Sequence, residues 1–223
     1  MRTLEDAARE AAGCVRCRLA QGRTQVVYGV GNPDADLMFI GEGPGFHEDR
    51  QGEPFVGAAG QLLNRMLGEI GLRRDDAYIA NVVMCRPPGN RDPRPDEIEA
   101  CAPYLAEKLD LIDPRILVTL GNFATRAILD TQSSISRLRG QRFGWRGRTV
   151  IPTFHPAAVL HGGGENSRQM QALREDFAEI RDALSERVLA ATAPGRAIGV
   201  DGSGNVVREA APDAGSQQQL GLF

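Results

Sequence analysis

Four apolar runs along the chain predict the strands of one sheet. Each is bounded by glycine, proline or charged residues, and each is too short for a typical helix. The runs are "LMFI", "AYIANVVMC", "RILVTLG" and "TVIPTFHP", and a further strand is expected before the turn at Asn32-Pro33-Asp34. Helical periodicity between the runs predicts helices over residues 2–12, 57–70, 95–111, 122–129 and 166–188.

The order of these elements predicts a parallel sheet. Strands that alternate with helices are typical of an α/β domain with helices on both faces of the sheet. Ligands of such sheets bind at the carboxyl ends of the strands. Those ends carry "GEGPG", "NVVMC", "LGN" and "TFHP", so we expect the unusual residues of this chain to meet at one edge.

The pattern of apolar positions ends near residue 189. Residues 190–223 are rich in Ala, Gly, Pro, Ser and Gln and have no sustained periodicity, which is typical of a flexible tail. We therefore expect one domain over residues 1–189 and a tail over residues 190–223.

Composition narrows the class of protein. The chain has 223 residues, of which 42% are hydrophobic and 25% charged, as in soluble globular proteins. No apolar run reaches the roughly 18–20 residues that span a bilayer, and the N-terminus lacks a signal-peptide pattern. A cytoplasmic location is therefore expected. The net charge of −3 argues against a generally basic nucleic-acid binder.

Arginines nevertheless gather in two segments. One holds Arg86, Arg91 and Arg94, and the other runs from Arg137 to Arg148. Such clusters are either solvated surface or contacts to phosphate groups, and the sequence leaves both interpretations open.

The four cysteines form a plausible ligand set. Cys14 and Cys17 stand in the CxxC segment "CVRC", and Cys85 and Cys101 follow further along the chain. Two disulfides are less expected in a cytoplasmic chain, and a single CxxC is also found in redox proteins. Four thiolates can hold zinc or an iron–sulfur cluster, and the spacing does not decide between them.

The loop "GEGPGFHEDRQGEPFVGAAG", residues 41–60, lies between a strand and a helix, where glycine-rich turns often bind phosphate. It matches neither GxGxxG nor the P-loop pattern, and its acidic residues would repel a phosphate. The remaining interpretations are a tight turn, or a backbone that approaches an uncharged ligand closely.

Three side chains near the predicted edge suit a flat ring. Asn81 ends a strand, where asparagine is disfavoured unless it has a specific hydrogen bond. His155 follows another strand, and Phe55 lies in the glycine-rich loop. Each has an ordinary structural interpretation, as a turn, a buried histidine or a core residue. Together they predict a pocket for a planar heterocycle.

The sequence resembles the family-four, iron–sulfur-containing enzymes of the uracil-DNA glycosylase superfamily. The resemblance is carried by "CVRC", by the segment from "VVYGVG" to "GAAGQLL", and by "YIANVVMCRPPGNRDPRPDEIEAC", "LVTLGNFA", "ISRLRGQ" and "PTFHPAAVL". It implies a three-layer α/β/α sandwich around a four-stranded parallel sheet. It also implies that Cys14, Cys17, Cys85 and Cys101 hold a [4Fe–4S] cluster, whose role would be to tie the N-terminal turn to the Cys85–Cys101 segment.

The resemblance further implies base-excision repair, in which the enzyme hydrolyses the N-glycosidic bond of uracil in DNA and leaves an abasic site. A flipped uracil would stack on Phe55 and pair with the Asn81 amide through N3–H and O4. His155 would donate to O2 as the base leaves. Glu42 and Glu48, with the Gly43 backbone, would position the attacking water.

Two positions differ from the pattern of the superfamily. The loop after "HP" usually carries a leucine wedge followed by a basic residue, and here Leu160 precedes His161. Duplex affinity should then be weaker or more dependent on pH. A related branch uses a histidine in an insertion for covalent capture, but "CRPPGNRDPRP" has neither.

The end of the chain, Gln219–Phe223 with the sequence "QLGLF", resembles the peptide by which bacterial repair proteins bind the sliding clamp. We expect a monomer that acts on uracil-containing DNA. Two other classes stay open: an iron–sulfur protein that senses DNA without catalysis, and a nucleotide-binding enzyme. The first predicts no effect of changing His155 or Asn81, and the second lacks its motif.

Overall fold

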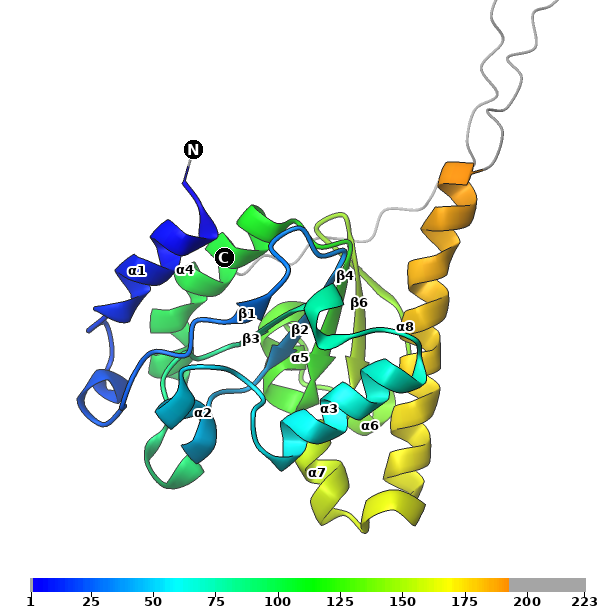
Figure 1. The fold of residues 1–223 in the computed structure, drawn as a ribbon. Helices are drawn as coiled ribbons and strands as arrows, with labels where there is room; N and C mark the ends of the chain where they lie inside the picture. The colour runs from blue at the N-terminus through cyan, green and yellow to red at the C-terminus, as the bar shows by residue number, and fades with distance from the viewer. Residues whose placement is uncertain (1, 193–223) are drawn as a thin grey trace, which may run out of the picture.

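The four apolar runs form parallel neighbours in a computed structural model, which describes residues 2–192 (Figure 1). They lie in a single sheet of six strands in the order β1-β3-β2-β4-β6-β5, so the expected count of four strands is wrong. The parallel strands β3, β2, β4 and β6 are central, and β1 and β5 pair antiparallel at the two edges. The strands are β1 (Val30–Gly31), β2 (Leu37–Gly41), β3 (Tyr78–Asn81), β4 (Ile116–Leu120), β5 (Phe143–Trp145) and β6 (Arg148–Thr153).

Strand β5 was not predicted, and the strand expected before the turn at Asn32-Pro33-Asp34 is reduced to the two residues of β1. Two or three residues cannot display the alternation that marks a strand. The turn between β5 and β6 has positive φ at both Arg146 (45°) and Gly147 (77°). This conformation suits a two-residue hairpin turn. In the sequence, the turn is indicated by the glycine of "WRGR".

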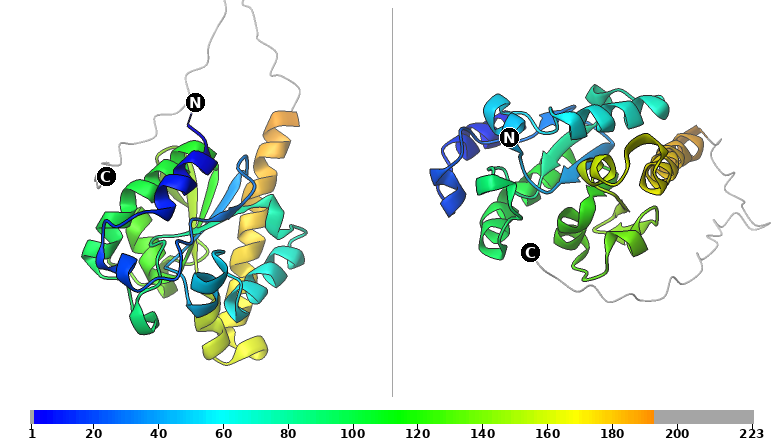
Figure 2. Two further views of the ribbon diagram at one scale, coloured as in Figure 1. Left: turned by 60° about the vertical axis from the view of Figure 1, so that its left-hand side comes forward. Right: turned by 90° about the horizontal axis from the view of Figure 1, so that it is seen from below.

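Helices cover both faces of the sheet. They are α1 (Leu4–Ala12), α2 (Phe46–Gln51), α3 (Ala58–Glu69), α4 (Pro95–Ile112), α5 (Gly121–Leu129), α6 (Ile135–Leu138), α7 (Pro156–His161) and α8 (Arg168–Thr192). Short 3₁₀ helices span Arg18–Gln21, Arg74–Asp76, Pro88–Asn90 and Gly164–Asn166. Figures 1 and 2 show α1 and α4 on one side of the sheet and α3 and α8 on the other.

Alternation along the strands divides the core in two. Met38 and Ile40 of β2 belong to the apolar cluster shared with α1, α4 and α5. Leu37 and Phe39 belong to the cluster shared with α3, α7 and α8. Successive strand residues point to opposite faces, so one strand serves both clusters. The result is the three-layer α/β/α arrangement expected from the sequence.

Three short helices were not predicted, namely α2, α6 and α7. Of these, α2 and α7 lie beside the carboxyl edge of the sheet. α2 falls inside the glycine-rich loop, and α7 replaces an expected loop after "HP". Helix α8 runs to Thr192, three residues past the expected domain end. The rest of the predicted tail, with Gln219–Phe223, lies outside the described residues. Within residues 2–192, no helix combines the length and apolar character needed to cross a bilayer.

Candidate active site

A cavity of about 390 Å³ opens at the carboxyl ends of β2, β3 and β6. Its volume is in the range of pockets that bind small molecules. Six of the seven non-cysteine residues that the sequence singled out line it: Glu42, Gly43, Glu48, Phe55, Asn81 and His155. Leu160 does not line it. It lies on α7, of which Ala157 and Ala158 face the cavity, and it is 37% exposed.

Strand pairing places Asn81 beside the start of the glycine-rich loop. Gly41 is the register partner of Asn81. The pairing continues past the strand ends, where Val82 N–H donates to Gly41 O at 2.9 Å and Val83 N–H to Glu42 O at 3.1 Å. The sheet itself therefore sets the position of Glu42 relative to Asn81.

The Asn81 side chain is buried with an unused acceptor. Asn81 is 2% exposed, and its Oδ1 has no hydrogen-bond partner. An unpaired buried acceptor costs about 1–3 kcal/mol, a cost that a ligand N–H would remove. Gly41 makes room for this arrangement, because a Cβ there would stand 2.4 Å from Asn81 Oδ1 and 2.7 Å from the Phe55 ring. The sequence analysis missed Gly41, although its place opposite Asn81 could have been found from the strand register.

His155 enters the cavity as a neutral hydrogen-bond donor. It is the N-cap of α7, where its Nδ1 accepts from Ala157 N–H at 3.2 Å. The neutral ring therefore carries its proton on Nε2. Burial lowers the pKa of His155 to about 4, although the nearby Glu48 carboxylate acts in the opposite direction. At neutral pH, the cavity thus offers an N–H donor without a positive charge.

Phe55 is held in an uncommon backbone conformation. Its φ is +55°, in the left-handed region, which costs on the order of 1–3 kcal/mol for such a residue. Val56 N–H and Gly57 N–H both donate to Glu48 Oε1 at 3.0 Å, and Arg74 donates to Phe55 O at 3.3 Å. The rings of Phe55 and His155 stack on each other, with their centroids 5.5 Å apart.

Glu42 and Glu48 therefore differ in their surroundings. One oxygen of Glu48 is committed to two backbone donors, so this carboxylate holds the Phe55 loop. Glu42 faces the cavity, and burial, helped by the nearby Asp92 carboxylate, raises the pKa of Glu42 to about 7. A carboxyl group with such a pKa can exchange a proton near neutral pH.

The four cysteines come from three segments that meet beside α4. Cys85 and Cys101 are buried, Cys14 and Cys17 are partly buried, and all four belong to or pack against one apolar cluster. All four are free cysteines in this structure. Burial raises the pKa of Cys85 and, to about 11, that of Cys101, and neighbouring cysteines act in the same direction.

The donor chemistry of this set is that of a metal site. Four soft sulfur ligands suit zinc or an iron–sulfur cluster, and Cys14 and Cys17 are brought next to the buried pair. As they stand in the part of the chain that the structure describes, no three His, Cys, Asp or Glu side chains form a group that could hold a metal ion. A metal site is therefore indicated by the four sulfur ligands and their proximity.

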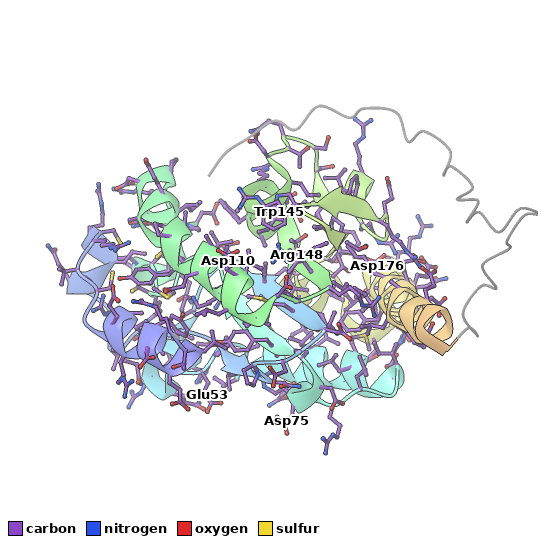
Figure 3. All side chains as sticks on the ribbon, turned by 90° about the horizontal axis from the view of Figure 1, so that it is seen from above. Glu53, Asp75, Asp110, Trp145, Arg148 and Asp176 are labelled. Carbon is purple, nitrogen blue, oxygen red and sulfur yellow. The ribbon has the colours of Figure 1, made fainter. Side chains whose placement is uncertain are left out.

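Four arginines of the predicted clusters pair with acidic side chains. Arg91 makes a bidentate pair with the fully buried Glu97, at 2.6 and 2.8 Å, and lowers the pKa of that carboxyl group to about 2. In the second cluster, the pairs are Arg139 with Asp176, Arg142 with Glu179 and Glu186, and Arg148 with Asp113. Figure 3 labels two of these residues, Arg148 on β6 and Asp176 on α8. These arginines stabilise the fold locally.

The fold and the cavity together define a class of protein. The carboxyl edge of an α/β/α sheet carries an aromatic wall, a buried amide with an open acceptor, a neutral imidazole donor and a carboxyl group with a pKa near neutrality. Such a set binds an uncharged planar ring with N–H and C=O groups on its edge.

Comparison with known proteins identifies the family. Residues 28–178 match the model of the uracil DNA glycosylase superfamily. The chain is 48% identical over 191 residues to the Type-4 uracil-DNA glycosylase of Sulfurisphaera tokodaii, covering 82% of this chain and 85% of the relative. It is also 48% identical over 196 residues to the Type-4 uracil-DNA glycosylase of Archaeoglobus fulgidus, covering 84% and 96%. The chain belongs to the uracil DNA glycosylase superfamily, as the sequence motifs predicted.

Proposed function

We propose that this cavity binds uracil flipped out of DNA and that the protein hydrolyses its N-glycosidic bond. The chain is a uracil-DNA glycosylase of base excision repair, which releases uracil and leaves an abasic site. The observation that supports this cavity as the uracil site is the unpartnered Asn81 Oδ1, buried beside a neutral imidazole donor.

Base selection follows from the hydrogen-bond pattern. Asn81 Oδ1 accepts from uracil N3–H, and the amide nitrogen donates to O4. Cytosine has an acceptor at N3 and a donor at N4, so it would leave buried groups unpaired on both sides. Phe55 supplies the stacking surface for the ring. In this proposal Gly43 lets the backbone approach the nucleotide, and Leu160 on α7 fills the space that the base leaves.

The chemistry divides between His155 and Glu42. Negative charge develops on uracil O2 as the bond breaks, and the Nε2–H of His155 donates to that oxygen. A preorganised donor of this kind contributes on the order of 3–4 kcal/mol. The sugar becomes cationic, and an ionised Glu42 stabilises it and orients the attacking water. Glu48 acts through the Phe55 loop, as its backbone hydrogen bonds indicate.

The proposal is tested by incubating the protein with a uracil-containing oligonucleotide and then with alkali. A strand break at the uracil, together with free uracil in the supernatant, supports glycosidic cleavage. If no break forms and no uracil is released, the assignment of this activity is wrong.

A pH dependence follows from Glu42. Its pKa is raised, so the carboxylate is lost as the pH falls through about 7, and kcat/KM on uracil-DNA should rise with pH around this value and level off above about pH 8. Replacing Glu42 by Gln should lower kcat about 100-fold and remove this step. The matched variant Glu48→Gln should keep the step, because its effect is on the loop. A step that persists near pH 7 in Glu42→Gln would assign it to another group.

The cysteines are proposed to hold a [4Fe–4S] cluster. Cys14, Cys17, Cys85 and Cys101 supply the four thiolates, and the bound cluster supplies a cross-link between the N-terminal segment, the loop after β3, and α4. None of the four cysteines lines the cavity, which agrees with a structural role.

Replacing Cys85 by Ser should remove iron and destabilise the fold. Loss of a cross-link worth several kcal/mol should lower Tm by roughly 10 °C, since 1 kcal/mol corresponds to about 2–4 °C in a domain of this size. Iron content, the visible absorbance of the purified protein and thermal melting measure these effects. Stoichiometric zinc in the wild-type protein, or iron retained in Cys85→Ser, would contradict the assignment.

The remaining expectations about partners stay proposals. We propose that the protein is a cytoplasmic monomer and that its terminal peptide, Gln219–Phe223, docks on the sliding clamp. The composition of residues 190–223 supports the tether, and the pattern of the last five residues supports the docking.

A further inference from the structure

An exposed aromatic ring stands at the rim of the cavity. Phe46 is the first residue of α2, and it directly follows Gly45, which lines the cavity. The ring side chain is on the surface, with the residue 46% exposed. A single exposed apolar residue is common on protein surfaces, but this one adjoins a residue that lines the cavity. The exposed part of the Phe46 ring is therefore within reach of a molecule that extends out of the cavity.

Two guanidinium groups contact this ring. The Arg86 guanidinium lies 5.1 Å from the ring centroid and that of Arg50 lies 5.6 Å from it. Arg86 is oriented by a 2.7 Å bond from its Nε to Asn90 Oδ1, and Asn90 also lines the cavity. The two cations thus lie beside the aromatic ring at the cavity rim.

Arg50 and Arg86 differ from the ion-paired arginines of the predicted clusters. Among the ion pairs of the described residues, none includes Arg50 or Arg86, whereas Arg91, Arg139 and Arg142 all have carboxylate partners. In a protein of net charge −3, two cations without an acidic partner beside an exposed ring form a local site for an anionic aromatic ligand. A nucleotide has both parts, a flat base and a phosphate.

We propose that Phe46, Arg50 and Arg86 form a platform that binds an unpaired nucleotide next to the uracil in single-stranded DNA. This inference rests on the proposed function, because the uracil in the cavity brings its neighbour to the rim. The neighbouring base stacks on Phe46, and Arg50 and Arg86 contact the adjoining phosphates. In a duplex, the neighbouring base stays paired and stacked, so the platform favours single-stranded substrates.

The first test is Phe46→Ala in the full-length protein. Stacking of one base on an aromatic ring is worth about 1–3 kcal/mol, so KM on single-stranded uracil-DNA should rise at least about fivefold, with kcat within about twofold. KM on duplex uracil-DNA should change less than about twofold. Phe46→Trp should keep wild-type values, and Phe46→Leu, which is apolar but not aromatic, should resemble Phe46→Ala. Equal losses on both substrates, or full activity of Phe46→Leu, would overturn the proposal.

A second test removes the partner base. Single-stranded substrates are made with an abasic spacer on the 5′ or on the 3′ side of the uracil. For the wild-type protein, one of the two spacers should raise KM by the factor seen for Phe46→Ala. With that spacer, Phe46→Ala should cause no further loss, because the two changes remove the same contact. Additive losses with both spacers would show that Phe46 stacks on neither neighbour.

The charges are tested by salt dependence. Anisotropy of a labelled single strand without uracil measures binding independently of catalysis, so it separates failure of the platform from failure of the proposed function. Arg50→Gln and Arg86→Gln should each reduce the slope of log K against log salt by about 0.7, the value for one phosphate contact on a single strand. Arg73→Gln, which changes an exposed arginine that pairs with Asp76 and does not line the cavity, should leave the slope unchanged. Unchanged slopes in both platform variants would overturn the phosphate contacts.

Discussion

Replacing His155 by Ala should lower kcat on uracil-DNA by about 10²–10³-fold and change KM little. In the proposed mechanism, the Nε2–H of His155 faces charge that develops on uracil O2 only as the bond breaks, so its loss affects the transition state more than substrate binding. Single-turnover rates on a uracil-containing single strand measure the effect. His155→Gln, which keeps an N–H donor on a longer side chain, should recover part of the lost rate.

The pH dependence distinguishes a neutral donor from a cationic one. Because burial lowers the pKa of His155 to about 4, the ring is neutral throughout the range above about pH 5.5. The ratio of wild-type to His155→Ala rates should therefore be constant from about pH 5.5 to about pH 8. A ratio that falls towards one as the pH rises through about 6.5 would show that the imidazolium is the active form.

Replacing Asn81 by Leu should abolish uracil excision and stabilise the protein at the same time. Leucine has nearly the same size but neither donor nor acceptor, so kcat/KM should fall at least about 10³-fold. The substitution also removes the buried unpartnered Oδ1, which costs about 1–3 kcal/mol in the free protein. At about 2–4 °C per kcal/mol, Tm should rise by a few degrees.

Asn122→Leu is the matched control. Asn122 Oδ1 accepts from Ile135 N–H at 2.8 Å and does not line the cavity. Its loss leaves that N–H without a partner, so Tm should fall while uracil excision persists. If Asn81→Leu also lowers Tm, or if it retains activity within tenfold of the wild type, Asn81 is a structural asparagine and the proposed base selection is wrong.

The sequence predicted the site through topology more than through any single motif. Asn81, His155 and Glu42 are far apart in the chain, but each follows an apolar run, and parallel strands end at one edge. That argument needed only the order of strands and helices. It was sufficient for the central strands, whose runs of four or more apolar residues are buried on both faces. It gave only the approximate place of β1 and did not find β5.

Side-chain partners could not be predicted in this way. The sequence presented Glu42 and Glu48 as equivalent, and only the structure shows that one carboxylate holds the backbone of Val56 and Gly57. The sequence left open whether Arg91 contacts phosphate or lies on the solvated surface. The structure shows that it pairs with the buried Glu97. Helix α2 was not predicted because glycines stand at both of its ends. Gly45 is its N-cap and Gly52, with φ of +79°, is its C-cap, so the sequence resembles a glycine-rich loop throughout. Such features depend on tertiary contacts that leave no period in the chain.

The pairing of Gly41 with Asn81 means that the register of β2 against β3 determines which side chain faces the cavity. Side chains alternate between the two faces of β3, so a slip of one residue against β2 would present Ala80 in place of the amide. In the proposed site, discrimination between uracil and cytosine therefore depends on the hydrogen bonds between β2 and β3, which hold Asn81 in register.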